Sequence, residues 1–128
     1  MDNKQAIENF WSARRIKYNI GLVIAGFSAF VCYAFVGGLL HIRDFEITLF
    51  TMIFQGIGYL VMMLVANVCY SLGAAYDQAT NKQGDLATSQ WFYNLGFWFS
   101  FALPFSIPIL LVILSLTGNL AEPSITVE

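Results

Sequence analysis

The chain is poor in charged residues. Asp, Glu, Lys and Arg make up 11% of its 128 residues, whereas a typical soluble domain has about 25%. So few ionic side chains cannot cover the surface of a soluble globule of this length. The net charge of −2 and a single short cationic cluster also argue against a nucleic-acid-binding protein.

Histidine and cysteine are equally scarce, with one and two residues respectively. A lone His41 gives one chain no metal or haem site, so we expect no metal and no cofactor. Cys32 and Cys69 lie in separate apolar runs, at membrane depths that differ by roughly 20 Å. Because a disulfide needs Cα atoms within about 7 Å, we expect both cysteines to be free and buried.

Groups that could do acid–base chemistry are missing from the apolar runs. Ionisable residues inside a membrane mark ion or proton pathways, and their absence argues against proton-coupled transport. An enzyme acting through His41, Asp44 and Glu46 is a distant third hypothesis, because the short segment that holds them supplies no pocket. The sequence therefore predicts a protein that is not an enzyme.

What the chain does have is three long uncharged runs, at residues 18–40, 47–76 and 86–121. Each exceeds the roughly 20 residues that cross a ~30 Å hydrocarbon core as a helix. The runs are continuously apolar, without the alternation typical of barrel strands. We predict one all-α integral membrane domain with transmembrane helices at 18–40, 47–72 and 91–116.

The cations are distributed unevenly around these helices. Five of the six lie on one side of the predicted topology, namely Lys4, Arg14, Arg15, Lys17 and Lys82. Arg43 is on the other side, and cytoplasmic flanks collect Lys and Arg. We expect a cytoplasmic N-terminus, a flexible extracytoplasmic tail at 117–128, and a location in a cell membrane, which we take to be a bacterial inner membrane.

The segment 1–17 has two interpretations. Its apolar residues recur at helical spacing around Trp11, which predicts an amphipathic helix. This helix either lies in the membrane interface or extends the first transmembrane helix into the cytoplasm. In the first case four side chains contact lipid headgroups, Trp11, Arg14, Arg15 and Lys17.

Uncharged polar residues inside the spans are the candidate site residues. An amide or hydroxyl in hydrocarbon seeks a partner, so we expect interhelical hydrogen bonds, or else the lining of a pore, from Gln55, Asn67, Asn94, Ser100 and Ser106. Small residues also recur at spacings of three and four, from Gly21 to Cys32 and again from Ala66 to Gly73. They predict close packing of the first two helices.

Two prolines interrupt the third helix. Pro104 and Pro108 remove the donors for two carbonyls one turn apart, so we predict a kink there. Rings crowd the same helix from Trp91 to Phe99, and the deeper ones suggest a surface for a partner protein, since three helices cannot enclose all of these rings. Before this helix we expect a polar connection at 76–90 with a turn at Gly84 and a helix cap at Thr88 or Ser89.

Two classes of function remain. The first is a small non-catalytic subunit or accessory component of a membrane assembly, held by helix–helix contacts in a homo-oligomer or a larger complex. The second is a homo-oligomeric channel or facilitator lined by Gln55, Asn67, Asn94 and the kink between Pro104 and Pro108. In both, the lipid bilayer is a partner and nucleic acid is not.

Overall fold

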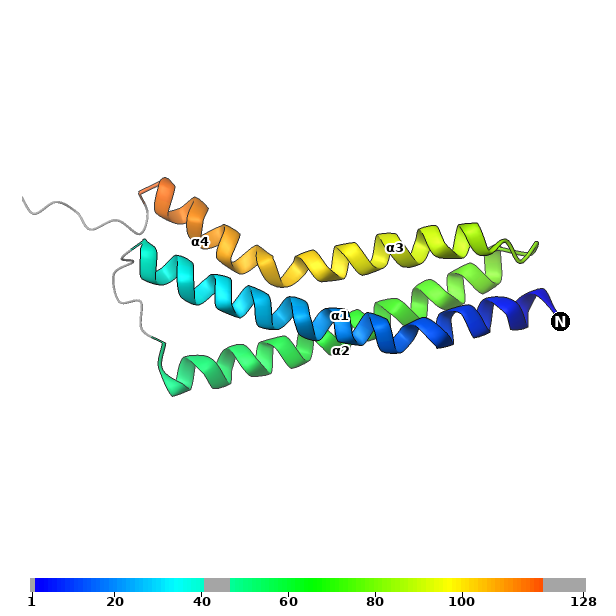
Figure 1. Cartoon of the computed structure of the whole chain (residues 1–128), viewed down its shortest axis with the longest axis horizontal. Helices are drawn as coiled ribbons and strands as arrows, with labels where there is room; N and C mark the ends of the chain where they lie inside the picture. The colour runs from blue at the N-terminus through cyan, green and yellow to red at the C-terminus, as the bar shows by residue number, and fades with distance from the viewer. Residues whose placement is uncertain (1, 41–46, 119–128) are drawn as a thin grey trace, which may run out of the picture.

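A computed structural model of the chain describes residues 2–40 and 47–118. They form helices α1 (Asn3–Leu39), α2 (Leu49–Thr80), α3 (Leu86–Ala102), the 3-10 turn η1 (Leu103–Phe105) and α4 (Ser106–Leu116). In Figure 1, α3, η1 and α4 follow one another as one bent rod beside α1. All three rods are long and apolar enough to cross a membrane, which confirms the predicted all-α fold with three transmembrane helices.

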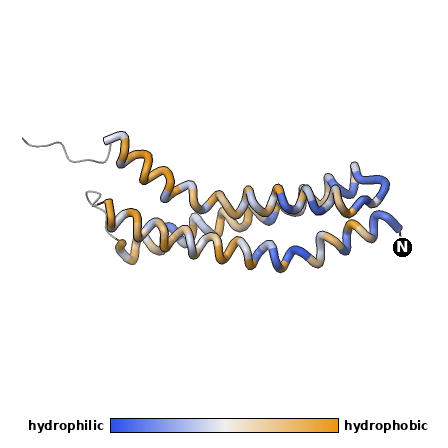
Figure 2. The backbone as a smooth tube through the Cα atoms, turned by 45° about the horizontal axis from the view of Figure 1, so that its top comes forward, coloured by the Kyte–Doolittle hydropathy of each residue, from blue (hydrophilic) through white to orange (hydrophobic). Residues whose placement is uncertain are grey.

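Hydropathy divides the bundle into two ends (Figure 2). The end that holds the start of α1 and the α2–α3 connection is hydrophilic, and we call it the polar end. The opposite end, where α1 and α4 finish and α2 begins, is hydrophobic, and we call it the apolar end. At about 1.5 Å per residue, the 37 residues of α1 greatly exceed a ~30 Å hydrocarbon core. The polar end therefore extends beyond the hydrocarbon.

The N-terminal segment is a continuous extension of α1. The helix runs without interruption from Asn3 to Leu39, so of the two predicted alternatives the structure has an extension of the first transmembrane helix rather than a separate interfacial helix. Its apolar residues Ile7, Phe10 and Trp11 are buried. They pack against the other two rods, and this contact removes their apolar surface from water.

α2 is longer than the sequence analysis predicts. It continues through Asp77 to Thr80, whereas the predicted span ends at residue 72. Most of the predicted connection at 76–90 is consequently helical, and the link between α2 and α3 is reduced to residues 81–85. The predicted turn at Gly84 is confirmed, because this residue has a φ of 69°, a conformation that glycine adopts without steric cost.

The cap of α3 is Asp85 rather than Thr88 or Ser89. The Asp85 carboxylate accepts hydrogen bonds from the Ala87 backbone N–H at 3.0 Å and from the Thr88 hydroxyl at 2.8 Å. The Thr88 hydroxyl, followed by the Ala87 N–H, lowers the pKa of Asp85. Because the folded-state pKa is depressed, the cap stabilises α3 at neutral pH, and this stabilisation is lost as the pH falls through that pKa.

Glycines let the rods approach closely at two levels of α1. At Gly21 an added Cβ would lie 2.5 Å from the Phe97 ring of α3, and at Gly26 it would lie 2.2 Å from the Tyr59 ring of α2. The predicted small-residue stripe thus receives α3 at Gly21. The close contact with α2 uses Gly26, which the stripe omits, and the Tyr59 hydroxyl donates to the Leu22 carbonyl at 2.7 Å.

The kink in the third rod lies where the prolines predict it. η1 covers Leu103–Phe105, and Pro104 and Pro108 are both buried. Both η1 and α4 pack against α1. The bend visible between α3 and α4 in Figure 1 keeps α4 alongside α1 toward the apolar end.

We expect substitution of Pro104 and Pro108 by alanine to straighten this rod, because each alanine restores a backbone donor. Loss of the fitted proline rings should lower the free energy of unfolding by about 1–3 kcal/mol while helical content is preserved. Spin labels at the exposed positions Phe35 and Leu116, in a background without the native cysteines, measure the α1–α4 separation. The separation should increase; an unchanged distance distribution contradicts the assignment of the bend to the prolines.

Candidate functional site

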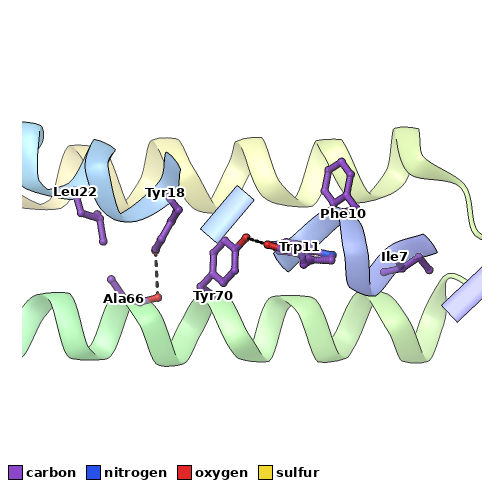
Figure 3. Packing of buried hydrophobic residues seen from close by; sticks show 7 residues of the cluster. All are labelled: Ile7, Phe10, Trp11, Tyr18, Leu22, Ala66 and Tyr70. Atoms are coloured by element: carbon purple, nitrogen blue, oxygen red, sulfur yellow. Dashed lines mark hydrogen bonds between the residues drawn. The ribbon is translucent and has the colours of Figure 1, made fainter. Parts of the chain in front are cut away.

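A cluster of buried, mostly aromatic side chains fills the middle and the polar end of the bundle. We call it the aromatic core; its buried members are Ile7, Phe10, Trp11, Tyr18, Leu22, Ala66 and Tyr70. Figure 3 shows Tyr18 and Leu22 of α1 directed at α2, whereas Phe10 points away from α2 and toward α3. Tyr93 and Phe97 of α3 pack against it while remaining partly exposed. The rings meet mainly edge to face, as at Trp11 and Tyr70 with centroids 5.1 Å apart, a preferred geometry for aromatic pairs.

Tyr18 connects all three rods through its hydroxyl. The oxygen lies 3.1 Å from the Ala66 carbonyl of α2 and 2.7 Å from Ser100 Oγ of α3. A phenol has a single proton, which goes to the carbonyl, so the Ser100 hydroxyl is the donor in the second bond. Ser100 therefore makes an interhelical hydrogen bond of the kind that the sequence predicts.

An ionisable side chain that the sequence analysis did not single out lies at the polar end. Asp77 of α2 is 0% exposed, and its carboxylate accepts from Trp11 Nε1 at 2.8 Å and from Asn81 Nδ2 at 3.2 Å. Both donors are neutral. The sequence did hold a signal, because Asp77 continues the four-three-four spacing of Ala66, Tyr70 and Gly73 along one face of α2.

The same hydrogen bond corrects the role predicted for Trp11. The side chain is only 5% exposed, so the indole has almost no surface left for lipid headgroups. An indole N–H in the interior needs an acceptor, and the Asp77 carboxylate provides a charged one. The aromatic core and Asp77 therefore explain Trp11 better than a membrane interface does.

Asn81 extends this polar cluster into the connection before α3. Its side-chain oxygen accepts from the Asp85 backbone N–H at 2.9 Å, and its amide donates to the Asp85 carbonyl at 2.8 Å. Ser89 of α3 is fully buried, with its hydroxyl 3.4 Å from Asn81 Nδ2. The buried carboxylate, the connection and the start of α3 are thus held together by one amide.

The three cations grouped together in the sequence analysis have different surroundings. Arg14 lies with its guanidinium carbon 3.7 Å from the Phe10 ring centroid and donates to Gln90 of α3 at 3.2 Å. Arg15 is exposed and donates to the Ser71 hydroxyl of α2 at 2.6 Å. Lys17 is also exposed. The Arg14 guanidinium is therefore held against α3, whereas the side chains of Arg15 and Lys17 are exposed at the surface.

The predicted polar residues do not converge on one site. Asn67 donates to Asn19 of α1 at 2.7 Å, an interhelical bond of the expected kind but within one chain. Asn94 is exposed and bonds only along its own helix, accepting from Gln90 at 2.8 Å. Gln55 is partly buried, and within the described residues it makes no hydrogen bond to another helix.

Ser106 is also a local contact, because its hydroxyl donates to the Leu103 carbonyl at 2.7 Å. Together these positions show no single lined path: Asn67 lies at the α1–α2 seam, Asn94 lies on the outer surface of α3, and the prolines are buried. A pore through one chain would need these groups to face a common space. Within residues 2–40 and 47–118, they do not.

Two further predictions concern cysteines and aromatic rings. Cys32 and Cys69 are free, as predicted, but both are exposed rather than buried, because the contacts between the rods involve neighbouring positions instead. Phe97 packs into the bundle, whereas Trp98 and Phe99 are 64% and 65% exposed. The bundle thus leaves some of these rings uncovered, as expected, and a partner on this surface of α3 stays a prediction.

Several predictions fall outside the described residues. They concern His41, Arg43, Asp44 and Glu46 between the first two helices and most of the tail at 117–128. Within the described residues, no three His, Cys, Asp or Glu side chains gather as metal ligands.

Three apolar helices held by internal hydrogen bonds define an all-α membrane protein. No protein-family model, no curated protein and no solved structure matches the chain.

We expect Trp11→Phe to destabilise the bundle, because it leaves the buried Asp77 carboxylate without its indole donor. The expected loss is about 1–3 kcal/mol, measured by reversible unfolding in mixed detergent micelles. Trp91→Phe, at a ring that is 60% exposed, is the matched control and should have almost no effect.

In an Asp77→Asn background, Trp11→Phe should lower the free energy of unfolding by a smaller amount. A buried neutral amide that loses a hydrogen-bond donor is destabilised less than a buried carboxylate. Equal costs in the two backgrounds would show that the indole stabilises the bundle by packing alone.

Proposed function

We propose that the chain is a small non-catalytic component of a membrane assembly, and that it binds its neighbour through the part of α2 toward the apolar end. α2 is the least covered helix: 6% of its most apolar window is buried, against 28% for α1 and 17% for the third rod. Its first turns are strongly exposed, as at Leu49, Phe50 and Phe54. Lipid alone can cover such side chains, so their exposure does not by itself favour a protein neighbour.

That observation is the set of glycines on this part of α2. A Cβ added at Gly56 or Gly58 would meet nothing within 4 Å, so neither glycine is required by packing inside the chain. A glycine inside a helix costs about 1 kcal/mol relative to alanine. In membranes, small residues allow a second helix to approach closely. The neighbouring amide of Gln55 has no interhelical partner within the described residues and would find one on such a helix.

The alternative is a homo-oligomeric channel or facilitator. It is supported by the positions of Gln55 and Asn94, whose amides are available at the surface of one chain and could line a space between several copies. The prolines and Asn67 would not contribute to that lining. Asn67 already bonds to Asn19 of α1, and the prolines are buried in η1 and α4, which pack against α1.

Mass determination of the complex in mild detergent distinguishes these functions. For a subunit we expect one foreign partner at fixed stoichiometry, lost when Gly56 and Gly58 are both replaced by leucine. Gly38→Leu is the control, since this glycine also has open space around it but lies at the end of α1. A symmetric homo-oligomer that conducts ions or solutes in vesicles would support the alternative. A chain that remains monomeric, or a double variant that assembles normally, would overturn the proposed surface.

We further propose that the polar end is cytoplasmic, in a bacterial inner membrane. The distribution of Lys and Arg supports this orientation, with five of six on that side of the topology. A cysteine introduced at Ser124, in a background without the native cysteines, should react in intact cells with an impermeant thiol reagent. Protection at Ser124 together with reaction of a cysteine at Asp2 would reverse the topology.

A further inference from the structure

A shallow, open groove lies along α2 and is lined by residues of α2 and by Arg15 of α1. It has a volume of about 750 Å³. Its polar contributors are Arg15, Asn67 and Ser71, and its apolar walls come from α2, through Leu60, Met63, Leu64, Val68 and Leu72. The groove thus combines a cation with a hydrocarbon surface.

The cation in this groove is held in place but not neutralised. The Arg15 guanidinium carbon lies 5.6 Å from the Tyr70 ring centroid, and one nitrogen donates to the Ser71 hydroxyl at 2.6 Å. No carboxylate among the described residues pairs with it. An arginine has five N–H donors, so most of its donors remain available to an anionic oxygen.

The position of the cation relative to the apolar walls limits the type of ligand. Eleven residues separate Leu60 from Ser71, which is about 16 Å along a helix at 1.5 Å per residue. One leaflet of a ~30 Å hydrocarbon core has about the same thickness. A ligand that satisfies both parts of the groove has an anionic head at Arg15 and a hydrocarbon chain that reaches toward the middle of the bilayer.

We propose that this groove binds an anionic phospholipid, with the phosphate at Arg15 and Ser71 and one acyl chain along Leu64 and Leu60. The proposal assigns different roles to cations that the sequence does not distinguish. Arg14 is occupied by Phe10 and Gln90, and Lys17 does not line the groove. Of these three cations, Arg15 alone combines an available charge with the apolar walls of the groove, and this holds whether or not the chain is a subunit of an assembly.

Native mass spectrometry of the full chain in neutral detergent, titrated with phosphatidylglycerol or phosphatidylcholine, tests the proposal. We expect a single tight phosphatidylglycerol, with phosphatidylcholine bound more weakly. Arg15→Gln should raise the dissociation constant for phosphatidylglycerol about five-fold or more. Arg15→Lys should retain most of the affinity. Lys17→Gln removes the same charge from the same turn of α1 outside the groove, and it should leave the affinity unchanged.

Ser71→Asp provides a second variant, because it places a carboxylate beside Arg15 at an exposed position and should abolish the preference for the anionic lipid without disturbing the core. Equal losses in Arg15→Gln and Lys17→Gln would overturn the site in favour of diffuse charge attraction. Equal binding of the two lipids would also overturn it. Displacement of the lipid by millimolar inorganic phosphate would show a site for free anions rather than for a lipid.

Discussion

The hydrogen bond between Trp11 and Asp77 constrains the polar end of the bundle more than any other contact. A carboxylate removed from water loses several kcal/mol of solvation unless protein donors replace the water. Asp77 has two such donors, and its position on α2 directs Tyr70 and Ala66 toward α1 as well, because all three share one face. The rotation of α2 about its axis is therefore fixed by the need to satisfy one charge.

The consequences of that constraint extend along the bundle in both directions. Toward the connection, Asn81 bonds to Asp77 and to the backbone of Asp85, so the start of α3 is positioned by the same cluster. Toward the middle of the bundle, Tyr70 of α2 and Tyr18 of α1 lie on the faces that these two helices turn toward each other. The Tyr18 hydroxyl contacts both α2 and α3. Polar groups in this half are used inside the chain, whereas the half of α2 toward the apolar end carries glycines and an amide without internal partners. The polar half is therefore held together by contacts within the chain, whereas the half of α2 toward the apolar end presents a surface available for association.

Charge gaps and proline chemistry were sufficient to predict three helices, their order and the bend at Pro104, because a bilayer requires about 20 apolar residues per helix and a proline cannot donate. The turn at Gly84 was also predictable. The C-terminal end of α2 was not, since a span placed by its apolar length cannot foresee that the helix continues through Asp77, whose carboxylate is satisfied by a tryptophan far away in sequence. Trp11 was misassigned for the same reason. The distinct roles of Arg14 and Arg15 depend on which neighbouring helix each side chain faces, and this is a property of packing rather than of spacing.

The long sequence separations in the core have a consequence for biosynthesis. Trp11 and Asp77 are 66 residues apart, and Tyr18 and Ser100 are 82 apart. Since a chain leaves the ribosome from its N-terminus, Trp11 has already emerged when Asp77 appears, and the carboxylate meets its donor as soon as the second helix is made. The partners of Tyr18 on the third rod arrive last. A chain that ends before residue 86 would thus contain every buried member of the aromatic core and the bond between Trp11 and Asp77, but it would lack the α3 side chains Tyr93 and Phe97 that pack against that core.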